Sequence, residues 1–202
     1  MKLGLVGFAG SGKTTLLKLV NRELYPVAGE GGSVRILGRS RWNVWDLRRH
    51  IGLVSPDLQY GFLPSSSVLE AILSGFFASI GVHAQLWDEI EPLQIERAEA
   101  VMKQLGLANL RNRAFDTLST GQQRRCLLGR ALVHDPAVLL LDEPLTGMTP
   151  TEKAHMIELI RKVHQQGITI LMVEHDMRSV MELCNYISVL DFGTLLVEGT
   201  PA

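Results

Sequence analysis

The chain has 202 residues and a formal net charge of -1, which leaves room for one α/β domain with a small inserted subdomain but not for two large domains. The balanced charge argues against a nucleic-acid partner, and the arginine pairs at 48/49 and 124/125 are interpreted as solvated helix faces. Cys126 and Cys184 lie far apart and outside any metal-ligand spacing, which favours a reducing compartment without a disulfide. No apolar window is long enough to span a bilayer, and we expect no signal peptide.

Apolar runs and helical patterns alternate through the first sixty residues. Lys2–Val6 is predicted to be a buried strand, and the segment behind the first glycine-rich stretch has the apolar periodicity of a helix. In chain order we expect a strand at 2–6, a helix at 14–24, a strand at 33–37, a helix at 42–50, a strand at 51–54 and a loop at 55–59.

The second part of the chain begins as helix and then returns to this alternation. From about 67 to 110 the periodicity is helical, with Ser67 as an N-cap and Glu70 three residues on. The unbroken apolar run Val138–Leu141 is typical of a strand buried on both faces of a parallel sheet. We expect helices at 96–107 and 118–134, a strand at 138–141, a helix at 151–166, a strand at 168–173, a helix at 177–184 and strands at 187–190 and 194–198. The alternation predicts an α/β fold in which helices flank a mainly parallel sheet, with a ligand at the carboxyl ends of the strands.

The segment Gly7–Thr15 matches the pattern G-x-x-x-x-G-K-[ST]. Its glycines allow successive amides to point into one concavity, and the helix that begins near Lys13 adds its positive end. We expect Lys13 to reach the β and γ phosphates and the Thr14 hydroxyl to ligate Mg²⁺. Because a strand precedes the segment and a helix follows it, a plain glycine-rich turn is disfavoured. The expected phosphate-binding residues are Gly7, Gly10, Ser11, Gly12, Lys13, Thr14 and Thr15.

Three further motifs follow in order: L-S-T-G-Q-Q at 118–123, V-L-L-L-D-E-P at 138–144 and M-V-E-H-D-M at 172–177. With the glycine-rich loop they resemble, over residues 1–202, the nucleotide-binding domain of ATP-binding cassette (ABC) proteins. The L-S-x-G-Q element makes the resemblance specific, because other phosphate-loop ATPases generally lack it. It implies a single phosphate-loop NTPase domain, with a RecA-like core at 1–59 and 111–202 and a helical subdomain at about 60–110.

The resemblance assigns roles at the site to three residues besides the phosphate loop, one as a metal ligand and two as catalytic residues. Asp142, at the end of an apolar strand, is expected to hold Mg²⁺ together with Thr14, and Glu143 to polarise the attacking water. His175 resembles the family's switch histidine, which senses the γ phosphate. With Lys13, Glu143 and His175 form the expected catalytic set.

The L-S-T-G-Q segment implies a partner. Ser119, Gly121 and Gln122 open a helix, so a hydroxyl and backbone amides lie at a positive helix end that can hold a γ phosphate. In the ABC family that phosphate belongs to ATP on the second subunit. The resemblance therefore implies a head-to-tail pair of ABC ATPase chains around two ATP molecules.

The chain departs from the family pattern at several positions. Pro56 stands where the family usually has a glutamine, so Gln59 is the candidate for that role beside Mg²⁺. Thr149 replaces an aspartate, which predicts weaker communication between subunits, and Thr120 replaces a glycine. The family's N-terminal antiparallel strands and their adenine-stacking aromatic residue are largely missing, which predicts weak, base-unselective nucleotide binding.

The two ends of the chain resemble different relatives. The first part is similar to molybdate-transporter or photorepair cassettes, and the last part to branched-chain amino-acid importer ATPases. Together with the short N-terminus, this mixture favours the hypothesis of a truncated, chimeric or designed cassette.

These features predict a Mg²⁺-dependent ATP hydrolase that energises a membrane transporter, located in the cytoplasm and held at the inner face of the membrane by partner subunits. The stretch 60–82, with Phe62, Leu63, Phe76, Phe77 and Ile80, is the candidate docking surface for transporter membrane subunits, and core packing is the alternative for it. Two other functions stay open: a nucleotide-binding module with little turnover, and a soluble regulatory or repair ATPase.

Overall fold

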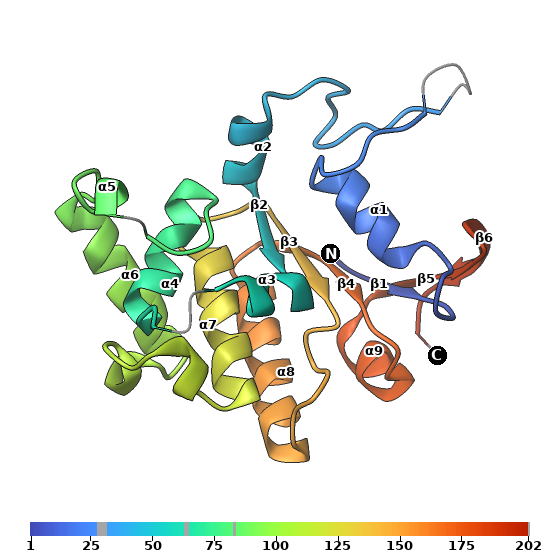
Figure 1. Ribbon diagram of the computed structural model, residues 1–202. Coiled ribbons are helices and arrows are strands. Elements are labelled where there is room, and N and C mark those ends of the chain that lie inside the picture. The colour runs from blue at the N-terminus through green and yellow to red at the C-terminus, as the bar shows by residue number, and fades with distance from the viewer. Residues whose placement is uncertain (28–31, 63–64, 83, 202) are drawn as a thin grey trace.

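The computed structural model describes residues 1–27, 32–62, 65–82 and 84–201, which contain a six-stranded sheet with helices on both faces (Figure 1). The strand order is β2-β3-β4-β1-β5-β6, and all neighbours are parallel except β5 and β6, which pair antiparallel. The strands are β1 (Lys2–Val6), β2 (Ile51–Val54), β3 (Val138–Asp142), β4 (Thr169–Val173), β5 (Tyr186–Asp191) and β6 (Thr194–Gly199). The predicted mainly parallel α/β sheet is confirmed.

Helices connect the parallel strands, because such strands need long crossovers. The α-helices are α1 (Lys13–Val20), α2 (Val44–His50), α3 (Pro56–Gly61), α4 (Val68–Leu73), α5 (Ala84–Trp87), α6 (Pro92–Gln104), α7 (Thr120–Leu132), α8 (Pro150–Gln165) and α9 (Met177–Leu183). Three short 3₁₀ turns are η1 (Ser74–Phe77), η2 (Ala108–Leu110) and η3 (Phe115–Thr117). The predicted capping box at the start of α4 is confirmed: Ser67 and Glu70 each accept a hydrogen bond from the other's backbone amide.

The central strand β3 is buried on both faces, as its apolar run predicts. Leu139 and Leu141 belong to the larger hydrophobic cluster, which also contains the buried faces of α7 and α8. Leu140 points to the opposite face, into a smaller cluster with Leu17 of α1 and Leu47 of α2. Successive side chains of a strand alternate between faces, so one run of leucines joins both helix layers to the sheet.

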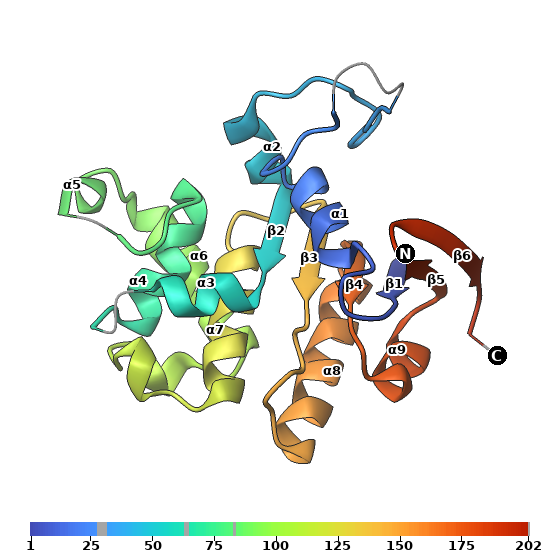
Figure 2. The same ribbon diagram turned by 45° about the vertical axis from the view of Figure 1, so that its right-hand side comes forward.

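The helices α4 and α6 lie beside the sheet, against α7, in both views of the ribbon (Figures 1 and 2). Their buried residues share the larger cluster with Leu127 of α7, so the core is continuous from this segment into the sheet layer. The division into a core at 1–59 and 111–202 and a helical subdomain at about 60–110 stays a prediction.

The predicted strand at 33–37 is wrong. Among the described residues, the pairing in this segment is an isolated bridge between Ile36 and Arg39, closed by a tight turn in which Leu37 and Gly38 both have positive φ. The Arg22 guanidinium donates to the Val34 carbonyl at 3.3 Å, so side chains rather than a neighbouring strand satisfy part of this backbone. Alternation alone predicts a strand only where a partner edge is available, and none of the six strands pairs with this segment.

The predicted loop at 55–59 is also wrong, because this segment forms the first part of α3. The Ser55 side chain accepts a hydrogen bond from the Leu58 amide at 3.3 Å, and Pro56 occupies the first helical turn. Ser-Pro is interpreted as a breaker in the sequence, but the same pair is a favourable helix start. The first helix, predicted at 14–24, ends earlier, at Val20. The other elements predicted outside the helical segment lie within a few residues of their expected bounds.

Candidate functional site

The candidate site lies where the carboxyl ends of β1, β3 and β4 meet. Parallel register places Leu5 of β1 and Asp142 of β3 beside the same residue of β4, Val173. The Glu143 amide donates to the Val173 carbonyl at 2.9 Å, so the chain remains bound to the sheet as it leaves β3. The fold therefore brings the glycine-rich loop, Asp142, Glu143 and the segment behind β4 to one edge of the sheet.

The loop 7–12 turns sharply between β1 and α1. Gly7 has φ of 153°, and a Cβ there would overlap the Leu190 carbonyl oxygen and lie 2.6 Å from Ser11 Oγ, so no larger residue fits. Ser11 is buried, and its carbonyl accepts a hydrogen bond from the Gly193 amide at 3.0 Å. The β5–β6 turn thus supports the loop from behind.

The helix α1 begins without a side-chain cap. Its N-cap, Gly12, is in the left-handed conformation with φ of 97°, and its first turn contains no acidic residue. The first amides of a helix lack partners inside the helix and carry the positive end of the helix dipole. This arrangement suits an anion bound at the loop.

Lys13 folds back over the loop that carries it. Its Nζ donates to the carbonyls of Gly7 at 2.9 Å and Phe8 at 2.8 Å, and to Ser11 Oγ at 3.2 Å. These three acceptors are neutral, so a phosphate oxygen would be a stronger partner for the ammonium group. Lys13 is therefore held beside the position that an anion would occupy.

Thr14 and Asp142 are brought together although 128 residues separate them in the chain. The Thr14 hydroxyl donates to Asp142 Oδ2 at 3.3 Å, while Asp142 Oδ1 is buried without a hydrogen-bond partner among the described residues. Burial raises the pKa of the Asp142 carboxyl above its usual value, and the neighbouring Glu143 adds to the rise. A buried carboxylate oxygen without a partner is a group that a cation would satisfy.

A cavity of about 180 Å³ opens beside this pair and is lined by Thr14, Lys18, Asp57, Leu58 and Asp142, among others. The Asp57 carboxylate lies 3.6 Å from Lys18 Nζ and faces the same space. Sequence reasoning missed Asp57 because it treated this segment as a loop; the first turn of α3 is what positions the side chain.

Gln59 lies on α3 as well, but its amide donates to Gln123 Oε1 of α7 at 2.6 Å. It does not line the cavity beside Asp142. The role of Gln59 as a metal ligand stays a prediction.

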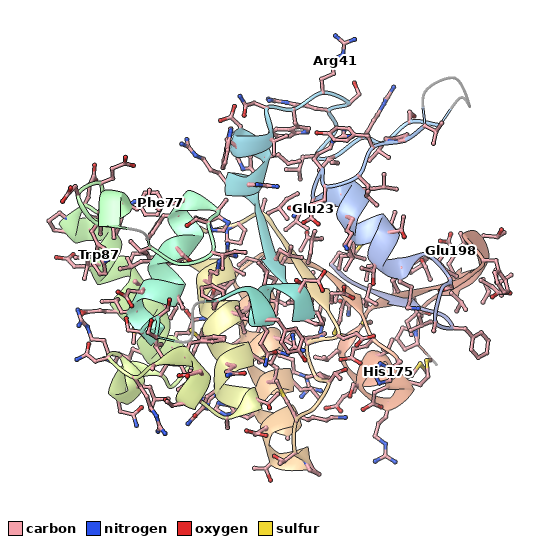
Figure 3. All side chains as sticks on the ribbon, viewed as in Figure 1. Glu23, Arg41, Phe77, Trp87, His175 and Glu198 are labelled. Carbon is pink, nitrogen blue, oxygen red and sulfur yellow. The ribbon has the colours of Figure 1, made fainter. Side chains whose placement is uncertain are left out.

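Glu143 and His175 face each other across the ends of β3 and β4. Glu143 Oε1 lies 3.8 Å from His175 Nδ1, and both side chains are accessible to solvent. Glu143 has φ of 46°, a backbone conformation that is uncommon for a residue with a side chain. Figure 3 shows His175 beside α9, on the segment that follows β4.

Glu174 holds these two segments together. Its side chain is 1% exposed and accepts hydrogen bonds from the Leu145 amide at 2.9 Å and the His175 amide at 3.2 Å. One carboxylate therefore fixes both the turn after Glu143 and the backbone of His175. Sequence reasoning did not assign this role; an acidic residue directly behind an apolar strand was the signal for it.

The interpretation of the 124/125 pair as a solvated helix face is wrong. Arg124 is 4% exposed, and its Nε and Nη1 have no hydrogen-bond partner among the described residues. Burial lowers the pKa of Arg124, while Tyr60 and the carboxylates of Glu143 and Glu174 oppose that shift. Arg125 donates to the Leu105 carbonyl at 3.0 Å. The reason for the error is that α7 is buried on most sides, between the sheet and the α4–α6 segment.

The start of α7 has the predicted cap. Ser119 Oγ accepts from the Gln122 amide at 3.3 Å, and Gln122 Oε1 accepts from the Ser119 amide at 2.9 Å. The same hydroxyl donates to Glu152 Oε1 of α8 at 2.9 Å. This end of α7 lies apart from the phosphate loop of its own chain in both ribbon views (Figures 1 and 2). The structure thus gathers Lys13, Thr14, Asp142, Glu143 and His175 at one edge of the sheet and leaves Ser119 outside the group.

The described part of the chain contains neither a metal-binding cluster of His, Cys, Asp or Glu side chains nor a membrane-spanning helix. Within residues 1–27, 32–62, 65–82 and 84–201, no group of three or more His, Cys, Asp or Glu side chains is arranged to hold a metal ion. None of the helices in these ranges combines the length and the apolar character that a bilayer-spanning helix requires.

Comparison with known proteins gives a consistent family. Residues 1–146 match the family model described as ABC transporter. The chain is 32% identical over 200 residues to the uncharacterized ABC transporter ATP-binding protein YlmA of Bacillus subtilis, covering 96% of this chain and 73% of that protein. It is 30% identical over 203 residues to the methionine import ATP-binding protein MetN 1 of Staphylococcus aureus, covering 98% of this chain and 56% of that protein.

Solved structures show the same fold. A nucleotide-free ATP-binding cassette from an ABC transporter superposes with a TM-score of 0.83 at 24% identity, covering 99% of this chain and 80% of that one. The cbiO1 protein of Clostridium perfringens, part of the ABC transporter complex cbiONQ, gives a TM-score of 0.82 at 26% identity, covering 99% of this chain and 77% of that one.

Proposed function

Because this chain belongs to the ABC transporter family, we propose that it binds ATP and hydrolyses it to ADP and phosphate in order to energise a membrane transporter. The observation that carries the proposal is the meeting of the glycine-rich loop, Asp142 and Glu143 at one edge of the sheet. The chain spans 56% of the length of the methionine import ATP-binding protein MetN 1, so no cargo is proposed.

ATP would place its phosphates over the loop 7–12. The amides at the uncapped start of α1 would donate to phosphate oxygens, and Lys13 would exchange its neutral carbonyl partners for the β and γ phosphates. The turn that only Gly7 can make brings the backbone close enough for these contacts. Binding and charge neutralisation are thus the work of backbone and Lys13 together.

Mg²⁺ would be held by the Thr14 hydroxyl and the Asp142 carboxylate. Asp142 Oδ1, which has no hydrogen-bond partner among the described residues, fits this role. Magnesium bound to a nucleotide needs few protein ligands, because phosphate oxygens and water complete its shell. When bound, Mg²⁺ supplies positive charge that offsets the charge developing on the phosphates. Thr15, the residue after Thr14, is the last of the expected phosphate-binding residues.

Glu143 would accept a hydrogen bond from the attacking water and orient it toward the γ phosphorus. His175, 3.8 Å away, would contact the same water or the γ phosphate once nucleotide fills the space between them. Glu174 positions both through the Leu145 and His175 amides, and it remains bound to the backbone throughout. In phosphoryl transfer such positioning and charge compensation account for most of the catalysis.

A second chain would complete the site. Ser119, Gly121 and Gln122 form a capped helix start that lies apart from the phosphate loop of the same chain (Figure 1). In a head-to-tail pair, the start of α7 from one chain would face the nucleotide on the other. The separation of these two groups within one chain supports this arrangement.

Transporter membrane subunits would dock beside η1 and α2. In the candidate stretch 60–82, Phe62 packs against Phe115 with ring centroids 5.1 Å apart, so it serves the core, and Leu63 lies outside the described residues. Phe76 and Phe77 line a cavity of about 270 Å³ together with the exposed Trp45. Figure 3 shows Phe77 on the side of the molecule opposite His175. Docking there would hold the chain at the inner face of the membrane from the cytoplasm.

Phosphate release by the purified chain tests hydrolysis. Glu143→Gln should lower the rate by about 100-fold or more while ATP binding is retained, because the change removes the base and leaves the loop intact. Glu158→Gln is the matched control, since Glu158 is an exposed carboxylate on α8 that pairs only with Lys162 among the described residues. Equal rates of phosphate release by wild type and Glu143→Gln would contradict hydrolysis at this site and favour a nucleotide-binding module with little turnover.

A further inference from the structure

The start of α7, which the proposed function assigns to phosphate binding, is in contact with a carboxylate of the same chain. Glu152, in the first turn of α8, reaches across and accepts a hydrogen bond from the Ser119 hydroxyl through Oε1 at 2.9 Å. Its side chain also covers Gly121, since a Cβ at Gly121 would lie 2.5 Å from Glu152 Oε1 and 2.6 Å from Cδ. Gly121 is buried for this reason, although it lies at a helix start near the surface.

The other carboxylate oxygen of Glu152, Oε2, binds a different residue. Oε2 accepts from the Thr149 amide at 3.1 Å and from the Thr149 hydroxyl at 3.0 Å, which forms the capping box of α8. The two oxygens are therefore divided, one bound to the start of α8 and one to the start of α7. Glu152 can release Ser119 without releasing Thr149.

Glu152 is charged near neutral pH. Hydrogen bonds hold its pKa below the usual value for a glutamate, with the largest contribution from the Thr149 amide and the next from the Ser119 hydroxyl. A carboxylate and a phosphate are both oxyanions and use the same donors, and two negative groups placed side by side repel each other. Glu152 and a phosphate cannot share Ser119 and the start of α7.

We propose that Glu152 competes with nucleotide phosphate for the start of α7. In the unpaired chain the Glu152 side chain occupies this position, and it must withdraw before the ATP of a second chain binds there. The inference rests on the proposed function, in which Ser119 and Gly121 serve the nucleotide of the partner. Its consequence is that Glu152 raises the ATP concentration at which two chains pair. Thr149 contributes to this competition, because its amide and hydroxyl hold the Glu152 side chain in place.

The variant Glu152→Gln separates charge from structure. Glutamine is accepted at this position of a capping box, so the start of α8 is retained while the negative charge is removed. Glu158→Gln removes one negative charge from an exposed site on the same helix and serves as the matched control. Glu152→Asp shortens the side chain but keeps the charge, which tests whether reach to Ser119 is required.

Titration with inorganic phosphate, without nucleotide, tests the competition in the separate chain. The amide of Gly121, followed by nuclear magnetic resonance, reports on the start of α7 and distinguishes it from the loop 7–12. Glu152→Gln should bind phosphate at Gly121 about threefold to tenfold more tightly than wild type and Glu158→Gln. An unchanged response in Glu152→Gln would overturn the inference.

Pairing with ATP, followed by light scattering in the Glu143→Gln background, separates this inference from the proposed function. The additional Glu152→Gln change should lower the ATP concentration for half-maximal pairing about threefold to tenfold. If Glu143→Gln never pairs while phosphate binding at Gly121 increases as expected, the proposed pairing fails and the competition stands. If Glu143→Gln pairs and Glu152→Gln changes neither measurement, the competition fails and the proposed function stands.

Discussion

Glu174 should be the residue on which the geometry of Glu143 and His175 depends most. Replacing it with alanine removes two hydrogen bonds to a buried charged acceptor, from the amides of Leu145 and His175. Hydrogen bonds to charged groups contribute about 1.5–3 kcal/mol each, which gives a gross loss of about 3–6 kcal/mol. Removal of a buried carboxylate recovers part of this, because its desolvation no longer opposes folding. We expect Glu174→Ala to lower the free energy of unfolding by about 2–4 kcal/mol.

Glu174→Gln should reduce stability less than Glu174→Ala. Its amide oxygen can still accept from Leu145, but the hydrogen bond to His175 is lost, so we expect a loss of about 1–2 kcal/mol. Urea unfolding followed by circular dichroism measures both variants, and an unchanged m value shows that the native state is still compact. The exposed Glu158→Ala should change stability by no more than about 0.5 kcal/mol.

Activity separates positioning from stability. At a temperature where Glu174→Gln is fully folded, its ATP affinity should be retained, because the loop 7–12 is untouched, while kcat falls. The reasoning would be refuted if Glu174→Ala were no less stable than the Glu158 variant, or if Glu174→Gln lost ATP binding and kcat in parallel.

Substitutions at Gly7, Asp142 and His134 each test a separate part of the structure. Gly7→Ala should abolish ATP binding measured by calorimetry, because its Cβ would overlap the Leu190 carbonyl. Gly10→Ala should have a smaller effect, because a Cβ there meets no atom of the described residues within 4 Å and the only cost is the positive φ of 78°. Asp142→Asn should raise the melting temperature of the protein without nucleotide, because burial disfavours the charged carboxylate and so raises its pKa. The same variant should lose the stabilisation that ATP with Mg²⁺ gives wild type. A melting temperature below that of wild type without nucleotide would contradict this prediction. Burial lowers the pKa of His134 from its usual value of 6.5 to about 4, so its contribution to stability is present above pH 6.5 and is lost as the pH falls toward 4, by roughly 3 kcal/mol in all. Urea unfolding from pH 7 to 4 should show a smaller loss of stability in His134→Gln than in wild type, and an equal loss would contradict the assignment.

The phosphate loop and the strand ends could be predicted from the sequence because each is specified locally. The spacing of Gly7, Gly12 and Lys13 admits few backbone paths, and the apolar run of β3 defines both its burial and the position of Asp142 at its end. Parallel pairing then brings separate motifs to one edge without further information.

The remaining features depend on contacts between distant segments. Arg124 looks like part of a charged helix face in the sequence, and only packing of α7 between the sheet and the α4–α6 segment makes it buried. The segment 33–37 alternates like a strand, but none of the six described strands offers it a partner edge. The contact of Glu152 with Ser119 joins residues 33 positions apart on two helices, and no local pattern predicts it.

The central claim is that one functional site consists of the loop of one chain and the start of α7 of another. Lys13→Ala disables the loop, and Ser119→Asp places a negative charge where phosphate would bind while keeping a good N-cap for α7. In a head-to-tail pair, mixing the two inactive variants leaves one intact site in each mixed pair, because Lys13 of one chain and Ser119 of the other are both native there.

The most direct measurement is the rate of phosphate release by an equal mixture of Lys13→Ala and Ser119→Asp. The account predicts that each variant alone is inactive and that the mixture recovers about a quarter of the wild-type rate, since half of the pairs are mixed and each has one intact site of two. A mixture that stays as inactive as its separate components would contradict a site shared between two chains.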